Sequence, residues 1–321
     1  TCYYGILGNS CWWSIDSYVY AYFQFGSNVL IFMDVISFQM PAGIVLVGIL
    51  GLMVGSFLNV VIYRLPIMME RVEKFYAWEV LHIDKEGMGE NPYEPTERFN
   101  LMVPGSRCPH CGTEIRFWQN IPVASYLLQR GRCVGCGAKI TIRYLLVEVL
   151  CAVLSILVVL KYPDPWQLAF ALLLTWSLLA LIFIDAEQQI LPDVITLPLM
   201  WLGIVAACVQ GGLFIGLRES VIGAMVGYLS LWSVYWLFRL VTGKEGMGYG
   251  DFKLLALLCA WQGIVMLPFI LFFSALTGIV FALINRIGYG VPMAFGPYLA
   301  IAGWLTFMYG GEIAAITGLS L

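Results

Sequence analysis

Two aspartates lie at places where an apolar chain should not tolerate charge. Asp185 ends the apolar run 178–184, and Asp251 follows a Gly-Tyr-Gly turn and opens the next apolar segment. An ionisable residue at the rim of a membrane-spanning segment is costly unless it is paired or hydrated, so it indicates a functional site. Two carboxylates that share a desolvated site cannot both ionise easily, so they hold one proton between them. The ionised member can then activate a water while the protonated member polarises a peptide carbonyl.

A purely structural interpretation of these acids stays open. Asp251 and Asp193 are both placed to act as helix N-caps, and for Asp193 this role is favoured. Asp185 would then be an interfacial residue in contact with water. Gly248 and Gly250 support the catalytic alternative, because glycines let the backbone approach a substrate strand closely.

Four of the nine cysteines form two C-x-x-C pairs, each followed directly by glycine. Such pairs supply four thiolates in a tetrahedron, which is typical of a structural zinc site. Two disulfides are the alternative, but the reducing cytosol to which we assign this segment disfavours them. A four-thiolate site has no open position, so we expect the metal to fold a small domain. His110 lies inside the first pair and is expected to face solvent. The predicted ligands are Cys108, Cys111, Cys133 and Cys136.

The composition is that of a membrane protein. Of 321 residues, 60% are hydrophobic and only 12% are charged, whereas about 25% are charged in a soluble globular protein. Aromatic residues make up 15% of the chain and the net charge is −3, which excludes disorder. The absence of a positive excess gives no indication of a nucleic-acid partner.

About eight apolar segments are long enough to be considered as membrane-spanning helices. The stretch 64–143 differs in composition, since it holds 11 of the 17 basic residues. We therefore predict an all-α polytopic membrane protein with a small zinc-binding domain inserted after its first span. The predicted spans are 42–63, 144–160, 166–184, 194–214, 220–240, 252–263, 264–285 and 293–309. The predicted divisions are an unassigned outer segment 1–41, the first span 42–63, the cysteine domain 64–143, a seven-helix core 144–310 and a C-terminal tail 311–321.

Basic residues at span ends predict the orientation. Arg64 ends the first span, and Lys139 and Arg143 precede the second, so the cysteine domain faces the cytosol. Alternate crossings then place both aspartates at the cytoplasmic rim and the N-terminus outside. Cys2 and Cys11 would lie outside, where they could form a disulfide.

A membrane transporter or channel is the alternative function from another class. Asp185 and Asp251 would be its cation or proton site, and the cysteine domain would sense a metal. Transporters usually show an internal repeat or charges near the bilayer midplane. The rim position of the two aspartates and the lack of an evident repeat favour the enzyme.

Two weaker motifs have adequate structural interpretations. Gly55 and Ser56 allow close helix contact and Asn59 can hydrogen-bond across helices, while Arg64 reads as an ordinary cytoplasmic anchor. The segment 295–298, FGPY, reads as a helix start with proline in its first turn.

Longer motifs carry a resemblance to a known family. They are GSFLNVVIYRLP at 55–66, the four-cysteine cluster, IDAEQQILPDVITLPLMWLG at 184–203, GKEGMGYGDFKLLA at 243–256 and FGPYLAIAGW at 295–304. In these motifs and their order the chain resembles the bacterial type IV prepilin leader peptidases and N-methyltransferases, which are GxGD-type aspartic peptidases of peptidase family A24. The first 40 residues resemble nothing in that family.

The resemblance implies a bifunctional enzyme of the bacterial inner membrane. Its two family aspartates fall on Asp185 and Asp251. Such enzymes cut prepilins and type II secretion pseudopilins after a glycine that ends a short basic leader, and then methylate the new N-terminus with S-adenosylmethionine. The cysteine domain is associated with the methylating members, since shorter relatives are peptidases only. Neither the methyltransferase residues nor the oligomeric state is indicated.

Two rival activities stay close to this family. A signal-peptide peptidase of the wider GxGD group would cut within the hydrocarbon region, and the cysteine domain argues against it. A chain with only one of the two activities is the other possibility.

Overall fold

The computed structural model describes residues 39–82, 91–94, 98–108, 110–115, 121–209, 212–286 and 293–318. Most of the predicted outer segment 1–41, including Cys2 and Cys11, lies outside these residues. Within them the regular structure is helical, and the β contacts are two isolated bridges, Arg107 with Glu114 and Arg132 with Lys139. The predicted all-α class is confirmed.

A helix is present at each of the eight predicted apolar segments, but the predicted fourth span 194–214 is too long, because its helix ends at Cys208. Within the described residues, six helices are long and apolar enough to cross a membrane, as expected of a multi-pass membrane protein. The other two are shorter: α6 has 16 residues and α8 has 14, which at 1.5 Å per residue gives about 24 and 21 Å against a hydrocarbon core of about 30 Å. The helices are α2 (Pro41–Leu81), α3 (Ala124–Leu128), α4 (Ile142–Lys161), α5 (Pro165–Gln188), α6 (Asp193–Cys208), α7 (Leu217–Thr242), α8 (Tyr249–Gln262), α9 (Leu267–Ile284, after the 3₁₀ turn Ile264–Met266) and α10 (Gly296–Thr317).

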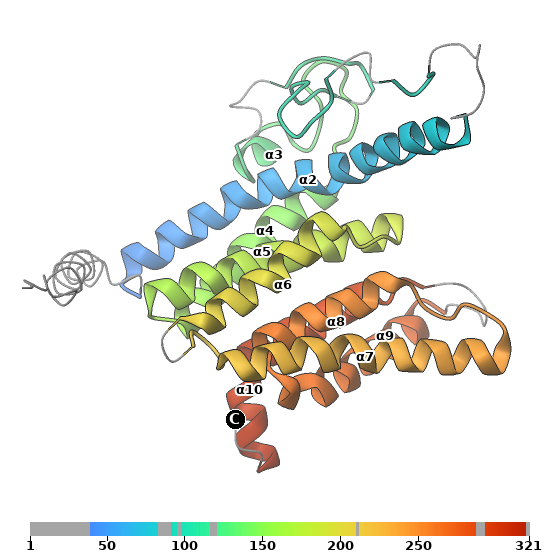
Figure 1. Ribbon diagram of the computed structural model, residues 1–321. Helices are drawn as coiled ribbons and strands as arrows, with labels where there is room; N and C mark the ends of the chain where they lie inside the picture. Colours follow the sequence, from blue (N-terminus) through green and yellow to red (C-terminus); the bar gives the residue numbers. More distant parts are fainter. Residues whose placement is uncertain are drawn as a thin grey trace, which may run out of the picture.

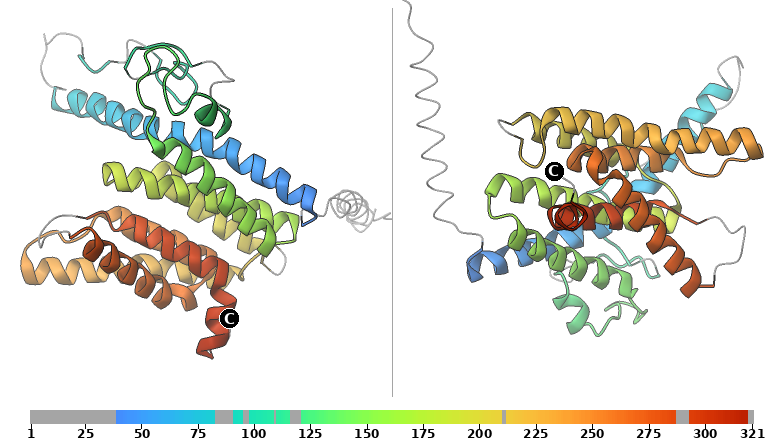
Figure 2. Two further views of the ribbon diagram at one scale, coloured as in Figure 1. Left: turned by 180° about the vertical axis from the view of Figure 1, so that it is seen from behind. Right: turned by 90° about the horizontal axis from the view of Figure 1, so that it is seen from below.

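Apart from the short helix α3, the helices form two layers (Figures 1 and 2). One layer holds α2, α4, α5 and α6, and the other holds α7 to α10. The cysteine-containing segment and α3 lie against the outer side of α2. At the right-hand end of Figure 1, α5 ends while α8 and α10 begin, so segments distant in the chain meet there.

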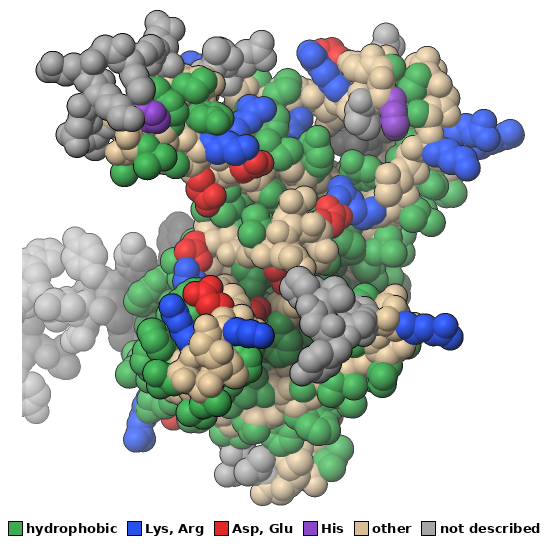
Figure 3. Space-filling model, turned by 90° about the vertical axis from the view of Figure 1, so that its right-hand side faces the viewer, with side chains coloured by type: hydrophobic (Ala, Val, Ile, Leu, Met, Phe, Trp, Pro, Cys, Tyr) green, Lys and Arg blue, Asp and Glu red, His purple; other side chains and the backbone are tan. Residues whose placement is uncertain are grey.

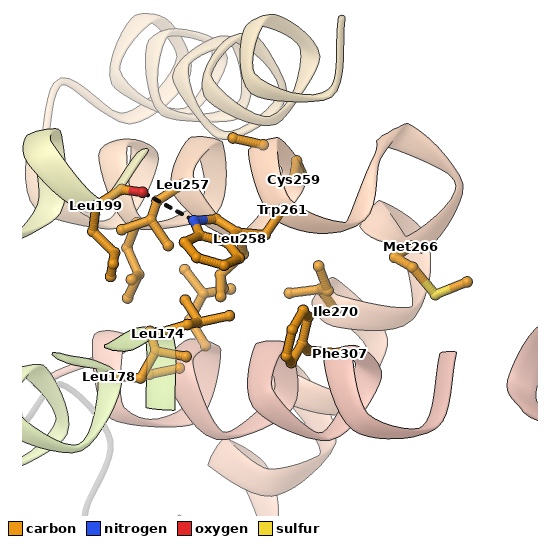
Figure 4. Close-up of a cluster of buried hydrophobic side chains, with 14 of the residues drawn as sticks. Leu174, Leu178, Leu199, Leu257, Leu258, Cys259, Trp261, Met266, Ile270 and Phe307 are labelled. Carbon is orange, nitrogen blue, oxygen red and sulfur yellow. Dashed lines mark hydrogen bonds between the residues drawn. The ribbon is translucent and has the colours of Figure 1, made fainter. Parts of the chain in front are cut away.

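Helix α8 is the centre of the fold. Among its residues from Asp251 to Gln262, all except Lys253 are buried, as expected for a helix that is apolar on every side. Trp261 fills the space between the layers and donates a 2.9 Å hydrogen bond from Nε1 to the carbonyl of Leu199 in α6 (Figure 4). The Gln262 amide donates to the carbonyl of Gly303 in α10 at 2.9 Å. These contacts fix α8 against both of its neighbours.

Helices α2 and α4 approach closely through glycines. A Cβ at Gly51 would lie 2.8 Å from Cα of Ala152, and one at Gly55 would lie 2.7 Å from Cα of Glu148. The close contact predicted from Gly55 and Ser56 is therefore confirmed. Asn59, one turn further along α2, donates to the carbonyl of Tyr144 in α4 at 3.0 Å.

Helix α2 continues beyond the predicted first span. It passes through Arg64 and Pro66 and ends only at Leu81. Arg64 is buried, and its guanidinium donates to the carbonyls of Asn100 at 2.9 Å and Pro104 at 2.7 Å. Arg64 is thus more than an ordinary cytoplasmic anchor, because its buried guanidinium holds the inserted segment against α2.

The last helix is also longer than predicted. Helix α10 reaches Thr317, and the predicted end of the last span at residue 309 coincides with a kink at Tyr309, where φ is −120° and ψ is 16°. Residues 311–317 of the predicted tail are therefore helical.

Candidate active site and metal cluster

Asp185 lies in the last turn of α5. The helix ends at Gln189, which has a left-handed backbone with φ 56° and donates its N–H to the Asp185 carbonyl at 2.9 Å. Asp185 itself is only 5% exposed. Asp185 is therefore not an interfacial residue in water, and that interpretation is wrong.

Asp251 is the third residue of α8. Gly248 occupies the N-cap position of this helix, and its backbone is extended with φ −78° and ψ 148°. Asp251 is therefore not the N-cap, and that interpretation is wrong; the residue is buried, with only 7% of its surface exposed. The Asp185 carboxylate acts on Asp251 electrostatically, so the fold brings together two buried acids from opposite layers.

The start of α10 completes this site. The Gly296 N–H donates a hydrogen bond to the Asp185 carboxylate. A side chain at Gly296 would collide with Oδ2 of Asp185, so only glycine allows this approach. The N-terminus of a helix also favours negative charge. The FGPY motif therefore has a role that the helix-start interpretation missed, and the signal was a glycine directly before the helix-starting proline.

Leu191 closes the site on the side of the α5–α6 connection. A Cβ at Gly250 would lie 2.9 Å from Leu191 Cβ, and one at Gly296 would lie 3.1 Å from Leu191 Cδ1. Gly250 is therefore needed for packing against Leu191. Gly248 differs, because a Cβ there would meet none of the described residues within 4 Å.

Asp193 does not cap α6. Pro192 holds the N-cap position, and Asp193 is the first residue of the helix without a capping hydrogen bond. Its carboxylate instead pairs with Lys253 of α8, at 2.7 Å from Nζ to Oδ2. The predicted cap is wrong because a tertiary ion pair replaces the local bond. Since Lys253 follows Asp251 by two residues, the pair fastens α6 to α8 beside the two buried acids.

A second ion pair joins the neighbouring helices at this end. Arg143 in the first turn of α4 lies 2.6 Å from Glu187 in the last turn of α5. Figure 3 faces this end of the bundle, and acidic side chains lie across its middle with basic side chains beside them. The carboxylates of Asp193 and Glu187 are thus each neutralised by a basic side chain. In contrast, no described Lys or Arg forms an ion pair with either of the two buried aspartates.

The four predicted cysteine ligands form one cluster. Their Sγ atoms all lie within 4.8 Å of one another, at 3.9 Å between Cys108 and Cys136 and 4.0 Å between Cys111 and Cys133. Zinc–sulfur bonds of about 2.3 Å in a tetrahedron place the sulfurs about 3.8 Å apart. The donor set therefore fits a single tetrahedral metal ion.

The two cysteine loops share one backbone conformation. Gly112 and Gly137 follow the two pairs with φ of 69° and 72°, which glycine adopts without strain. The N–H of each glycine donates a 2.9 Å hydrogen bond to the backbone carbonyl of the first cysteine of its pair. His110 is exposed, as predicted.

The charge of the cluster also calls for a cation. The Cys111 thiol contacts the Thr113 hydroxyl at 3.1 Å, and this contact together with the Thr113 N–H lowers the pKa of the thiol to about 6. Although the N–H of Ala138 opposes the change, burial and the other three thiols raise the pKa of Cys136 to about 11. The four sulfurs cannot all ionise together unless a metal ion neutralises them.

Comparisons with known proteins cover both parts of the chain. Residues 49–162 match the bacterial peptidase A24 N-terminal domain, and residues 172–283 match the type IV leader peptidase family. A prepilin leader peptidase/N-methyltransferase of Dichelobacter nodosus is 62% identical over 87% of this chain and 96% of its own length. The chain belongs to the type IV leader peptidase family. The proteins of the same name from Pseudomonas putida and Neisseria gonorrhoeae are 53% and 48% identical over 85% and 86% of this chain and over 92% and 93% of their own lengths. No solved structure matches.

The family match and the site geometry coincide. Asp185 and Asp251 lie in the stretch that matches the leader peptidases, and the cysteine cluster lies in the N-terminal match. Gly296 lies beyond both stretches, although it contacts Asp185.

Replacing Gly296 with alanine should lower leader cleavage strongly. The new Cβ would displace the Asp185 carboxylate, and a misplacement of about 1 Å at a reacting group costs about 100-fold in rate. The initial rate of cleavage of a prepilin substrate in membranes measures the effect. Gly311→Ala in the same helix is the matched control, because a Cβ there meets nothing within 4 Å. Equal rates for the two variants would show that Gly296 does not position Asp185.

Proposed function

We propose that this protein cleaves the leader peptide of type IV prepilins and then methylates the new N-terminal amine. The observation that carries the proposal is the burial of Asp185 and Asp251 together at one end of the bundle, in a chain of the leader peptidase family. A buried acid pair without cationic partners fits an aspartic peptidase.

The two aspartates divide the work of hydrolysis. The ionised carboxylate takes a proton from a water, whose oxygen attacks the carbonyl carbon of the scissile peptide bond. The protonated carboxyl group donates its proton to the carbonyl oxygen, which gives a tetrahedral intermediate. As the C–N bond breaks, the proton taken from the water passes to the departing nitrogen, and a hydroxyl of the intermediate returns a proton to the other carboxylate. The Gly296 N–H orients Asp185 throughout. The substrate is held extended along Gly248, where the described residues leave the backbone open.

The basic leader stays on the side where α2 projects beyond the bundle. Glu70, Glu73 and Glu79 lie on this part of the helix as partners for it. Glu70 already pairs with Lys74 at 2.7 Å, so Glu73 and Glu79 are the more available carboxylates.

The metal and the methyl donor complete the enzyme. We assign Zn²⁺ to the four-cysteine cluster as a structural ion of domain 64–143, and the peptidase to the core 144–310. S-adenosylmethionine supplies an electrophilic methyl group. We place the protein in the bacterial inner membrane in contact with lipid, with its N-terminus outside and both the cysteine domain and the aspartates at the cytoplasmic face. Type II secretion pseudopilins are further substrates.

One assay tests both activities. The purified full chain is incubated with a prepilin and labelled S-adenosylmethionine, and the products are identified by mass. We expect loss of the leader after its last glycine, followed by the addition of one methyl group to the new N-terminus. An intact prepilin after prolonged incubation would overturn the proposal, and a cut at another position would point to a different peptidase.

A further inference from the structure

Glu148 is a buried carboxylate that the peptidase site does not use. It lies in the second turn of α4 and is only 9% exposed. Its Oε2 accepts a 2.8 Å hydrogen bond from the N–H of Val123 in the inserted segment, and Ser56 of α2 also hydrogen-bonds to it. Helix α2, helix α4 and the cysteine-containing segment therefore meet at this side chain.

Glu148 has no cation of its own among the described residues. The basic side chains that flank this junction on α2 and α4 are Arg64 and Arg143, and both have other partners. Arg64 donates to two backbone carbonyls, and Arg143 pairs with Glu187. Buried charges in proteins are normally paired, so the carboxylate lacks the positive partner that its burial demands.

Asn59 adds a second acceptor at the same junction. It is 5% exposed, and its amide nitrogen donates to the carbonyls of Gly55 and Tyr144. Its Oδ1 is buried and has no hydrogen-bond partner in the part of the chain that the structure describes. It lies three residues from Ser56 on the same face of α2, opposite the turn of α4 that precedes Glu148. A buried acceptor left unpaired is costly, and Asn59 contacts α4 at Tyr144, one turn before the carboxylate that lacks a cation.

The ligand that suits this pair is a primary ammonium group, which carries positive charge and only donates hydrogen bonds. Leader cleavage produces such a group as the new N-terminus. The two sites lie on helices that are packed together. Val147, next to Glu148, and Ile184, next to Asp185, belong to one apolar cluster, and the Arg143–Glu187 pair joins α4 to α5.

We propose that Glu148 and Asn59, at the junction of α2, α4 and the inserted segment, bind the α-ammonium of the cleaved substrate and prepare it for methylation. This inference rests on the proposed function and deepens it. Glu148 takes one proton from the ammonium. The nitrogen lone pair then forms the N–C bond with the methyl group of a sulfonium donor, while the S–C bond breaks and its electron pair stays on sulfur as a thioether. The product is a secondary ammonium, and Glu148 returns its proton to water.

The test separates methylation from cleavage. A synthetic peptide that begins with the free N-terminus of a processed pilin is methylated by the full chain with labelled S-adenosylmethionine. For Glu148→Gln we expect kcat/KM for this peptide to fall about 100-fold, the size of a general-base contribution. Activity should recover as the pH rises above about 8, because the α-amino group then loses its proton unaided. Cleavage of the full prepilin by the same sample should be unchanged.

A second variant tests the binding role. Asn59→Leu removes the unpaired acceptor, and we expect KM for the peptide to rise about tenfold, as for the loss of one hydrogen bond to a charged group. The KM for S-adenosylmethionine should not change, which distinguishes the substrate amine from the amino group of the methyl donor. Glu312→Gln, an exposed acid at the opposite end of the bundle, is the control and should retain both activities.

Two results would overturn the inference. One is that Glu148→Gln methylates the peptide at the rate of the unchanged chain. The other is a loss of methylation that does not recover at high pH and is accompanied by loss of bound metal, which would show a purely structural role. If the wild-type chain itself fails to methylate the peptide, the proposed function fails instead.

Discussion

Asp185→Asn and Asp251→Asn should each stop leader cleavage. Asparagine keeps the shape of the side chain but can neither accept the proton of the attacking water nor share a proton with its neighbour. The loss should be at least about 1,000-fold, within the range of acid–base catalysis. The amount of processed pilin formed in membranes over time measures it.

The same samples contain an internal control. Each variant should still methylate a peptide that already has a free N-terminus, because Glu148 and Asn59 are untouched. Asp164→Asn is the matched control for cleavage: Asp164 caps the other end of α5 by accepting from Trp166 and Gln167, and asparagine caps equally well. Substantial cleavage by either dyad variant would remove both residues from the catalytic assignment.

The sequence was sufficient to predict the helices and the meeting of the two acids. Apolar segments of span length predict a helix wherever lipid leaves the backbone no other partner. Counting crossings placed Asp185 and Asp251 on one side, and the structure brings them together in the interior. Both inferences depend on the lipid bilayer, which imposes the same requirement on every apolar segment of the chain.

Local preferences failed where a distant residue decides the outcome. Asp193 has the type and position of a helix cap, but Lys253 lies close enough to pair with it. Arg64 resembles any basic residue at a span end, yet it is buried by a segment almost 40 residues later. Pairing between segments so far apart in the chain leaves no periodic pattern to detect.

Gly296 shows a different limit. Its importance is the absence of a side chain beside Oδ2 of Asp185, which depends on how α10 packs against α5. Only the folded structure gives that distance. Glu148 could have been noticed, since it is an acid inside an apolar span, but its lack of a cationic partner is visible only from the structure.

Removing one cysteine of the cluster should separate the two activities. Cys133→Ser leaves three thiolates, and a structural zinc site contributes directly to the folding of its domain. We expect the metal content to fall from about one ion per chain to a small fraction of that. Methylation should be lost, because the N–H of Val123 would no longer be held against Glu148.

Cleavage should survive this change, because the peptidase site is built without the inserted segment. Asp185 is positioned by Gly296, Leu191 closes the site, and Lys253 fastens α6 to α8, all within the helical core. Metal analysis, methylation of the free peptide and cleavage of the prepilin in one preparation test all three expectations. Cys208→Ser, at an exposed cysteine outside the cluster, should leave metal and both activities intact. If cleavage fell together with methylation in Cys133→Ser, the metal domain would be part of the peptidase, since the core alone would not keep the two aspartates in place.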